Sequence, residues 1–319
     1  MNIAASIHTL GSVRFSTAIA AACALGVAGV VLPAEPRAAG VLQDAAAPAA
    51  SFRDGVVMND GRRVHYLEWG SPTSRPFIMV HGIGRSAHSY DHVAALLQAE
   101  YRVIAMDMRG HGDSDWHPDG AYLVEDYVTD LERLVDVLGL RDIALTGSST
   151  GGRVAQVYAG LHPDRVWKLI VEDVGPERPA NISRGFAQRA ERDGEGWASE
   201  DALLARLRQG ATRVPEAQHR TWIRYETRRL DSGRVVWKYD PDIARGFVPT
   251  ELWEYVRRIE APTLYLLGAE SRIVPPETQV QLKATRPNIE VVTVPDAGHY
   301  PHQETPEVFL AVVRAFLAG

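Results

Sequence analysis

From Phe52 onward, short apolar segments alternate with helix-like segments, and this alternation constrains the fold more than any other feature. It predicts an α/β fold with a mostly parallel central sheet and helices on both faces. Within the expected helix 121–138, apolar residues recur at three- and four-residue steps. Two further helices are expected, at 151–161 and 307–317. The expected strands are 63–69, 76–80, 101–108, 142–146, 166–172, 263–267 and 289–294.

One long segment interrupts the alternation. Residues 175–260 contain helical patches but no clear strand, and they hold four of the seven tryptophans. We therefore predict a helical cap at 175–260, inserted into a core made of residues 51–174 and 261–319. Residues 1–50 differ in composition and form a signal-like or disordered leader.

Composition and charge narrow the functional classes. The chain has 319 residues and a net charge of −6, which argues against a nucleic-acid binder and leaves a small-molecule substrate. No cluster of residues has the spacing of metal ligands, so neither a metal nor another cofactor is expected. The single cysteine, Cys23, lies in the leader, so we expect no disulfide framework. The oligomeric state is not predicted.

The leader resembles a secretory signal. Arg14 precedes an uncharged run from Phe15 to Leu32, and small residues follow. This pattern favours export, to the periplasm or outside the cell. The alternatives are a cytoplasmic protein whose start codon is mis-assigned, with a disordered leader, and an uncleaved anchor, which would be the only membrane contact.

A Gly-x-Ser-x-Gly motif stands between an expected strand and an expected helix. The motif is Gly147-Ser148-Ser149-Thr150-Gly151. A tight turn there forces its central residue into a strained conformation and pushes the side chain of Ser149 above the sheet. Ser149 is therefore the candidate nucleophile.

A nucleophilic serine needs a base and donors for the oxyanion. The candidate base is His299, which directly follows the last expected strand, and His302 is a nearby alternative. The candidate oxyanion donors are the backbone N–H groups of Thr150 and of Ile83. Ile83 lies in the loop His81-Gly82-Ile83-Gly84, and His81 is expected to shape that turn rather than to transfer protons.

Across residues 52 to 319, the chain resembles the α/β-hydrolase superfamily. The motifs His81-Gly82, Asp107-Met108-Arg109-Gly110-His111-Gly112-Asp113-Ser114, the Ser149 turn and Asp296-Ala297-Gly298-His299 fall in the family's order and spacing. The resemblance implies that the run 109–114 builds a turn under the site. A serine at position 149 argues against the branches that need an aspartate nucleophile.

The acid of the triad is less clearly marked. Family members commonly carry it in a Gly-x-x-Asp pattern after the seventh strand, where this chain has Gly268-Ala269-Glu270-Ser271. Other branches place an aspartate after the sixth strand and carry serine in the later loop. This pattern favours Asp173, with Glu270 and Glu172 as alternatives.

The resemblance implies a serine hydrolase that forms an acyl-enzyme on Ser149. The expected substrate is a small carboxylic ester, a lactone or a thioester. One alternative is a carbon–carbon bond hydrolase of the same superfamily, and another is a non-catalytic ligand-binding member of the fold.

Overall fold

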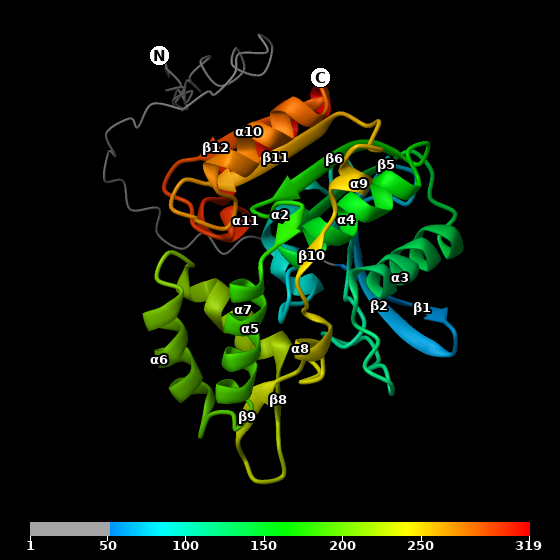
Figure 1. The fold of residues 1–319 in the computed structure, drawn as a ribbon. Helices are drawn as coiled ribbons and strands as arrows, with labels where there is room; N and C mark the ends of the chain where they lie inside the picture. Colours follow the sequence, from blue (N-terminus) through cyan, green and yellow to red (C-terminus); the bar gives the residue numbers. More distant parts are fainter. Residues whose placement is uncertain (1–51) are drawn as a thin grey trace, which may run out of the picture.

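The computed structural model describes residues 52–319, whose core is an eight-stranded sheet in the order β1-β2-β4-β3-β5-β6-β11-β12 (Figure 1). β2 runs antiparallel to both β1 and β4, and the other neighbours are parallel. The strands of this sheet are β1 (Arg53–Asn59), β2 (Arg62–Trp69), β3 (Pro76–Val80), β4 (Arg102–Met106), β5 (Ile143–Ser148), β6 (Val166–Glu172), β11 (Thr263–Gly268) and β12 (Ile289–Val294).

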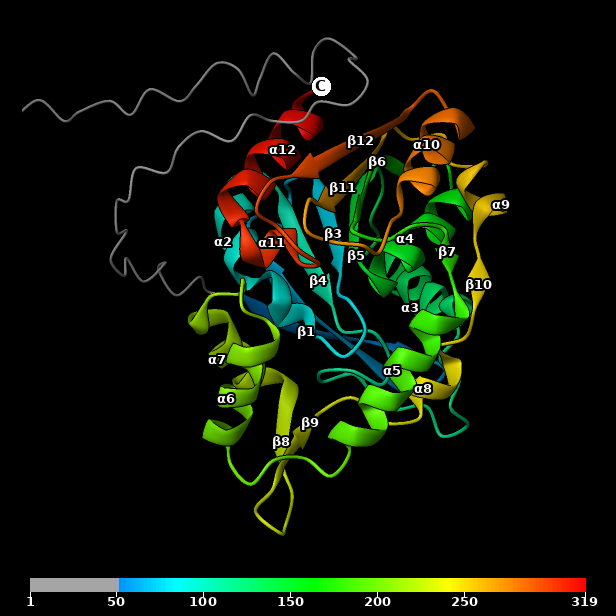
Figure 2. The ribbon, with the colours of Figure 1, turned by 60° about the vertical axis from the view of Figure 1, so that its left-hand side comes forward.

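Helices cover both faces of the sheet, as Figure 2 shows. One apolar cluster joins one face to α2 and α12, and a second joins the other face to α3, α4, α9 and α10. The predicted fold class, a mostly parallel sheet between helical layers, is confirmed. The helical elements of the core and its connections are η1 (Ala87–Tyr90), α2 (Asp91–Leu97), α3 (Val124–Val137), α4 (Thr150–Leu161), α9 (Trp253–Val256), α10 (Pro276–Thr285), α11 (Pro301–Glu304) and α12 (Pro306–Ala318).

Elements with a buried, regular apolar pattern were the ones that the sequence predicted. The strands at 76–80, 166–172 and 289–294 have the predicted bounds. β1 was missed because it is an edge strand in which only Val57 is buried, so it shows no alternation. α10 was missed because only Thr278 and Leu282 are buried along it. A periodic pattern of apolar residues arises from burial of one face, so it does not reveal elements that are mostly exposed.

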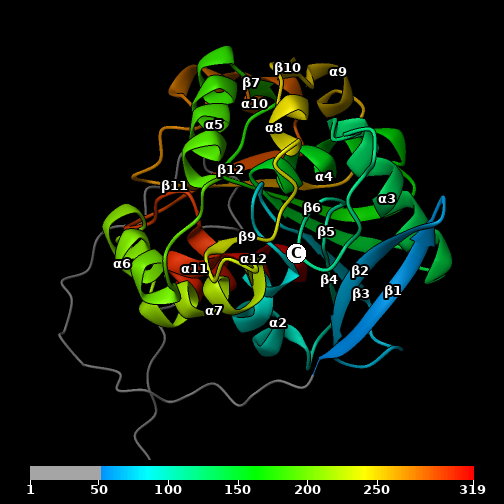
Figure 3. The same ribbon diagram turned by 90° about the horizontal axis from the view of Figure 1, so that it is seen from below.

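The segment between β6 and β11 lies largely at one end of the core, below the sheet in Figure 2 and toward the viewer in Figure 3. It contains short strands, which corrects the expectation of none: β7 pairs with β10, and β8 pairs with β9. Strands of two or three residues are too short to show alternation. Besides α9, its elements are β7 (Glu177–Arg178), α5 (Ala180–Asp193), α6 (Glu200–Gly210), α7 (Glu216–Glu226), β8 (Thr227–Arg229), β9 (Val235–Trp237), α8 (Ile243–Gly246) and β10 (Thr250–Glu251).

The leader, Cys23 and the export signal all fall outside the described residues. Within 52–319, no helix has both the length and the apolar character needed to cross a membrane.

Two glycines allow β5 and α4 to pack closely around Ser149. A Cβ atom on Gly151 would lie 2.0 Å from the carbonyl oxygen of Val80, and one on Gly147 would lie 2.2 Å from the backbone of Gly151. Both contacts involve backbone atoms, which cannot rotate away as a side chain does. The Gly-x-Ser-x-Gly pattern thus follows from the packing of β3, β5 and α4.

Gly151→Ala is expected to lower the free energy of unfolding by about 3 kcal/mol or more, because the added methyl overpacks fixed backbone. Gly185→Ala is the control, since Gly185 lies in α5 with no atom within 4 Å of the added Cβ. That change should be neutral or stabilising by up to about 1 kcal/mol through helix propensity. Urea unfolding followed by circular dichroism measures both. Equal effects of the two variants would contradict the packing argument.

Candidate active site

Ser149 occupies a strained turn between β5 and α4. Its φ is 54° and its ψ is −119°, a combination that non-glycine residues rarely adopt. The turn is held by the N–H of Ser149, which donates to the carbonyl of Glu172 at 3.0 Å. The half-buried Ser149 lines a cavity of about 220 Å³. The strand–turn–helix geometry therefore presents the hydroxyl to a small, partly open cavity.

The predicted oxyanion donors lie beside Ser149. Ile83 and Thr150 line the same cavity, and Gly82 approaches so closely that an added Cβ would lie 3.2 Å from the Cβ of Ser149. Thr150 is the first residue of α4, so its N–H has no acceptor within the helix. The positive end of the helix dipole adds to the stabilisation of negative charge there.

Asp173 holds the imidazole of His299. Asp173 Oδ2 accepts a hydrogen bond from His299 Nδ1 at 2.7 Å, and His299 lines the cavity together with Ser149. Asp173 is fully buried and has a φ of 46° just after β6. Its Oδ2 also accepts from Ser271 Oγ at 2.6 Å, and Oδ1 accepts from the N–H of Gly268 at 3.1 Å. With the proton on Nδ1, the Nε2 atom of His299 is left as the basic nitrogen.

The structure places the two alternative acids elsewhere. The side chain of Glu270 is 53% exposed and lies 3.4 Å from Arg213. Glu172 is buried, but its carboxylate accepts from both the N–H and the Nδ1 of His302, at 2.7 and 2.8 Å. Each is engaged by a partner other than His299. Ser271, which stands where many family members carry the acid, instead donates to Asp173.

His302, the alternative base, is buried against β6 and is not among the residues that line the cavity. Its ring stacks on Tyr90 with the ring centroids 4.7 Å apart. The Glu172–His302 pair therefore anchors α11, the short helix that follows His299.

His81 shapes the turn at 82–84, which contains the candidate oxyanion donor Ile83. Its Nδ1 donates to the carbonyl of Gly82 at 2.7 Å, and its Nε2 accepts the N–H of Met108 at 3.0 Å. Burial lowers the pKa of His81, which keeps the ring neutral in this role. The ring thus ties the loop after β3 to the loop after β4.

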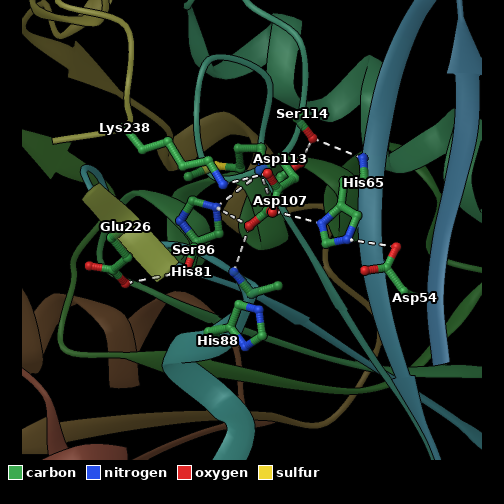
Figure 4. Close-up of polar contacts among 12 residues, drawn as sticks. Asp54, His65, His81, Ser86, His88, Asp107, Asp113, Ser114, Glu226 and Lys238 are labelled. Atoms are coloured by element: carbon green, nitrogen blue, oxygen red, sulfur yellow. Dashed lines mark hydrogen bonds and ion pairs between the residues drawn. The ribbon is translucent and has the colours of Figure 1, made fainter. Parts of the chain in front are cut away.

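The loop after β4 is built around the carboxylate of Asp107 (Figure 4). This carboxylate accepts from His65 Nδ1 at 2.7 Å and from the N–H groups of Ala87 and Asp113, at 2.7 and 2.9 Å. Burial raises the pKa of Asp107, but the hydrogen bond from His65, the nearby imidazoles of His81 and His65, and the N–H of Asp113 outweigh it and bring the pKa to about 2. The run 109–114 therefore encloses a buried carboxylate below the turn at 82–84.

His65, Asp107 and Asp113 are the one group of potential metal ligands that meets within residues 52–319. Both oxygens of Asp107 already accept hydrogen bonds, and the ammonium of Lys238 contacts Asp113. These contacts account for the group without a metal ion.

Sequence reasoning missed two arginines at the cavity. Arg153 and Arg178 line it together with Phe186 and Phe247. A second cavity of about 200 Å³ shares Ile83, Arg189 and Tyr300 with the first, and is lined by Trp197, Trp222 and Trp237. A count of tryptophans and arginines could not show which of them face a cavity, because that depends on how the segment folds.

Glu226, at the end of α7, is also a residue that the sequence did not single out. Its carboxylate accepts from Arg85 Nη1 at 2.7 Å and from Ser86 Oγ at 3.3 Å, which joins α7 to the loop after β3. Burial raises the pKa of Glu226 from 4.5 to about 7, although the charge of Arg85 lowers it.

Comparisons with known proteins agree with this fold. The family model described as the alpha/beta hydrolase fold matches residues 75–306. The chain is 30% identical to a 3-hydroxybutyrate-oligomer hydrolase of Cupriavidus necator, over 86% of this chain and 99% of the relative. It is 31% identical to an sn-1-specific diacylglycerol lipase of Mus musculus, over 78% of this chain and 83% of the relative. The crystal structure of E-2-(acetamidomethylene)succinate hydrolase shares the fold, with a TM-score of 0.76 at 24% identity over 84% of this chain and all of that one.

The stability of the contact between α7 and the core is expected to depend on pH. Because the pKa of Glu226 is higher in the folded chain, its contribution is present at low pH and is lost as the pH rises through about 7. From pH 5 to pH 8, the wild type should lose up to about 3 kcal/mol of unfolding free energy relative to Glu226→Gln. Urea titrations at each pH measure the difference. Glu216→Gln, at an exposed site on the same helix, is the control, and its stability should follow that of the wild type at each pH. Parallel pH profiles of the wild type and Glu226→Gln would refute the prediction.

Proposed function

Because the chain belongs to the α/β-hydrolase fold family, we propose that it is a serine hydrolase with Ser149 as nucleophile, acting on a small carboxylic ester, lactone or thioester. The observation that carries the proposal is the 2.7 Å hydrogen bond from His299 to Asp173, beside a cavity that His299 and Ser149 both line.

In the proposed reaction, Ser149 Oγ attacks the carbonyl carbon while His299 Nε2 takes the hydroxyl proton. Asp173 keeps the imidazole in one tautomer and stabilises the imidazolium, without itself taking the proton. The tetrahedral intermediate then expels the alcohol or thiol, which leaves with the proton from His299. A water molecule, deprotonated by His299, attacks the acyl-enzyme and releases the carboxylic acid and free Ser149.

The carbonyl oxygen becomes negative in the tetrahedral intermediate and needs fixed donors. We assign that role to the N–H groups of Ile83 and Thr150, which flank Ser149 in the cavity. Such donors accelerate the reaction because they are already oriented before charge develops.

Two relatives support an ester as the substrate. One is named a hydrolase of 3-hydroxybutyrate oligomers and another a diacylglycerol lipase. The cavity of about 220 Å³ supports a small acyl group.

A fluorophosphonate should label the wild-type protein covalently, because the activated serine attacks its phosphorus. Ser149→Ala should not be labelled, and mass spectrometry of the digested protein should place the adduct on Ser149. Turnover of para-nitrophenyl esters, with a vinylogous diketone alongside, then separates ester from carbon–carbon bond hydrolysis. A folded wild-type protein that fails to label would exclude the enzyme and favour a ligand-binding role.

Asp173→Asn should lower kcat for a para-nitrophenyl ester by roughly 10⁴-fold, because the amide no longer holds the correct tautomer of His299. Glu270→Gln is the matched control, and its kcat should stay within about threefold, since exposed ion pairs contribute little. Steady-state kinetics decide, and near-normal activity of Asp173→Asn would assign the acid to another residue.

A further inference from the structure

Two buried arginines line the cavity beside Ser149. Arg153 lies one turn into α4 and is 1% exposed, and Arg178 lies in β7 and is 6% exposed. Arginine is rarely buried in proteins unless an acidic group neutralises it. The charged partners of these two residues are therefore informative.

Within residues 52–319, no carboxylate lies within 4 Å of either guanidinium. Arg153 donates to the carbonyls of Gly175 and Pro176, at 3.2 and 2.8 Å, and to Thr250. Among the described residues, the guanidinium of Arg178 makes one hydrogen bond, 3.4 Å long, to the carbonyl of Val248. Its Nη2 atom has no partner among the described residues, and its guanidinium carbon lies 3.9 Å from the ring centroid of Phe247. Arg178 is thus the less satisfied of the two.

No acidic side chain is paired with either of these two positive charges in the part of the chain that the structure describes. Burial lowers the pKa of Arg178 to about 10, and burial together with the charge of Arg178 lowers the pKa of Arg153 to about 9. Both still carry their proton at neutral pH. A bound anion would oppose both shifts, because an opposite charge favours the protonated form.

One acidic side chain, Glu177, lies in the same wall, but its oxygens are engaged elsewhere. They accept from Trp253 Nε1 at 2.8 Å and from Thr278 Oγ1 at 3.1 Å. A third arginine, the exposed Arg189, also lines the cavity. The wall that faces Ser149 therefore has an excess of positive charge.

We propose that the acyl part of the substrate ends in a carboxylate that binds Arg178, with Arg153 adding charge behind it. This inference rests on the proposed function. A planar carboxylate can accept two parallel hydrogen bonds from a guanidinium, a capacity that the one long hydrogen bond of Arg178 leaves largely unused. The neighbouring cavity, lined by Trp197, Trp222 and Trp237 together with four arginines, offers space for the alcohol part of the substrate, and we place the carboxylate on the acyl side.

The test compares two substrates with the same leaving group and acyl chain length. Mono-para-nitrophenyl glutarate ends in a carboxylate, and para-nitrophenyl pentanoate ends in a methyl group. We expect the ratio of their kcat/KM values, glutarate over pentanoate, to fall by about tenfold to a hundredfold in Arg178→Met. Arg178→Lys, which keeps the charge but loses the planar fork, should fall between.

Arg184→Gln is the matched control, because it removes one positive charge from an exposed position on α5 that does not line the cavity. Its ratio should stay within roughly twofold of the wild type, since exposed charges are screened. An equal fall in Arg184→Gln and Arg178→Met would assign the effect to overall charge and overturn the proposal. An unchanged ratio in Arg178→Met would also overturn it.

Two further measurements keep the outcomes separate. If circular dichroism shows that Arg178→Met is misfolded, the decisive measurement is inhibition of pentanoate turnover by free glutarate in the wild type and in Arg178→Lys. We expect glutarate to inhibit the variant more weakly. Equal inhibition of the two would refute the proposal. Fluorophosphonate labelling of the same preparations monitors the proposed function. Labelling with pentanoate turnover but no selective effect of Arg178 would overturn this inference alone, whereas no labelling and no turnover would overturn the proposed function as well.

Discussion

The carboxylate of Asp173 is the interaction on which the arrangement of the site depends. It is fully buried, and its oxygens accept from Gly268 at the end of β11, from Ser271 in the next loop and from His299 after β12. One side chain at the end of β6 thus joins two segments, at 268–271 and at 299, that lie far from it in sequence. Its loss would leave buried donors without an acceptor, which is a costly state in a low-dielectric interior. The groups that orient His299 are therefore also groups that hold the strand ends together.

Glu172, the residue before Asp173, extends this arrangement in two directions. Its carboxylate holds His302, and its backbone carbonyl accepts the N–H of Ser149. The end of β6 consequently contacts the nucleophile turn on one side and the histidine loop on the other. Because Asp173 and Glu172 hold His299 and His302 respectively, that loop is fixed at two points. A side chain held in this way loses little further freedom when a substrate binds.

The sequence was sufficient to predict local geometry, and insufficient to predict which distant segments meet. Gly147 and Gly151 are needed because β5 and α4 pack too closely for a Cβ atom at either position. The turn at Ser149 could therefore be predicted from its neighbours. The choice among Asp173, Glu172 and Glu270 was open because it depends on which strand end approaches the histidine loop. Motif spacing along the chain does not give that distance.

The residues between β6 and β11 were the least predictable for the same reason. Glu226 and Arg178 are ordinary polar positions in the sequence, and they acquire meaning only from the core residues against which they pack. Burial of charge is a property of the folded arrangement. A helical pattern or a charge count therefore cannot separate an arginine on a solvated face from one beside the nucleophile.

The excursion between β6 and β11 begins and ends on strands that are hydrogen-bonded neighbours. The two strands run parallel, so the segment leaves β6 at its carboxyl end and enters β11 at its amino end. The entropic cost of closing such a loop rises only slowly with its length. Such a segment can therefore change in length while the ladder between β6 and β11 is kept, provided that the apolar residues that α9 adds to the core are retained. The cavity wall that carries the arginines is built from both parts of the chain, because Arg153 belongs to α4 of the core and Arg178 belongs to β7 of this segment. Changes confined to the segment between β6 and β11 would therefore alter one part of the cavity wall and leave the strand ends that carry Ser149, Asp173 and His299 in place.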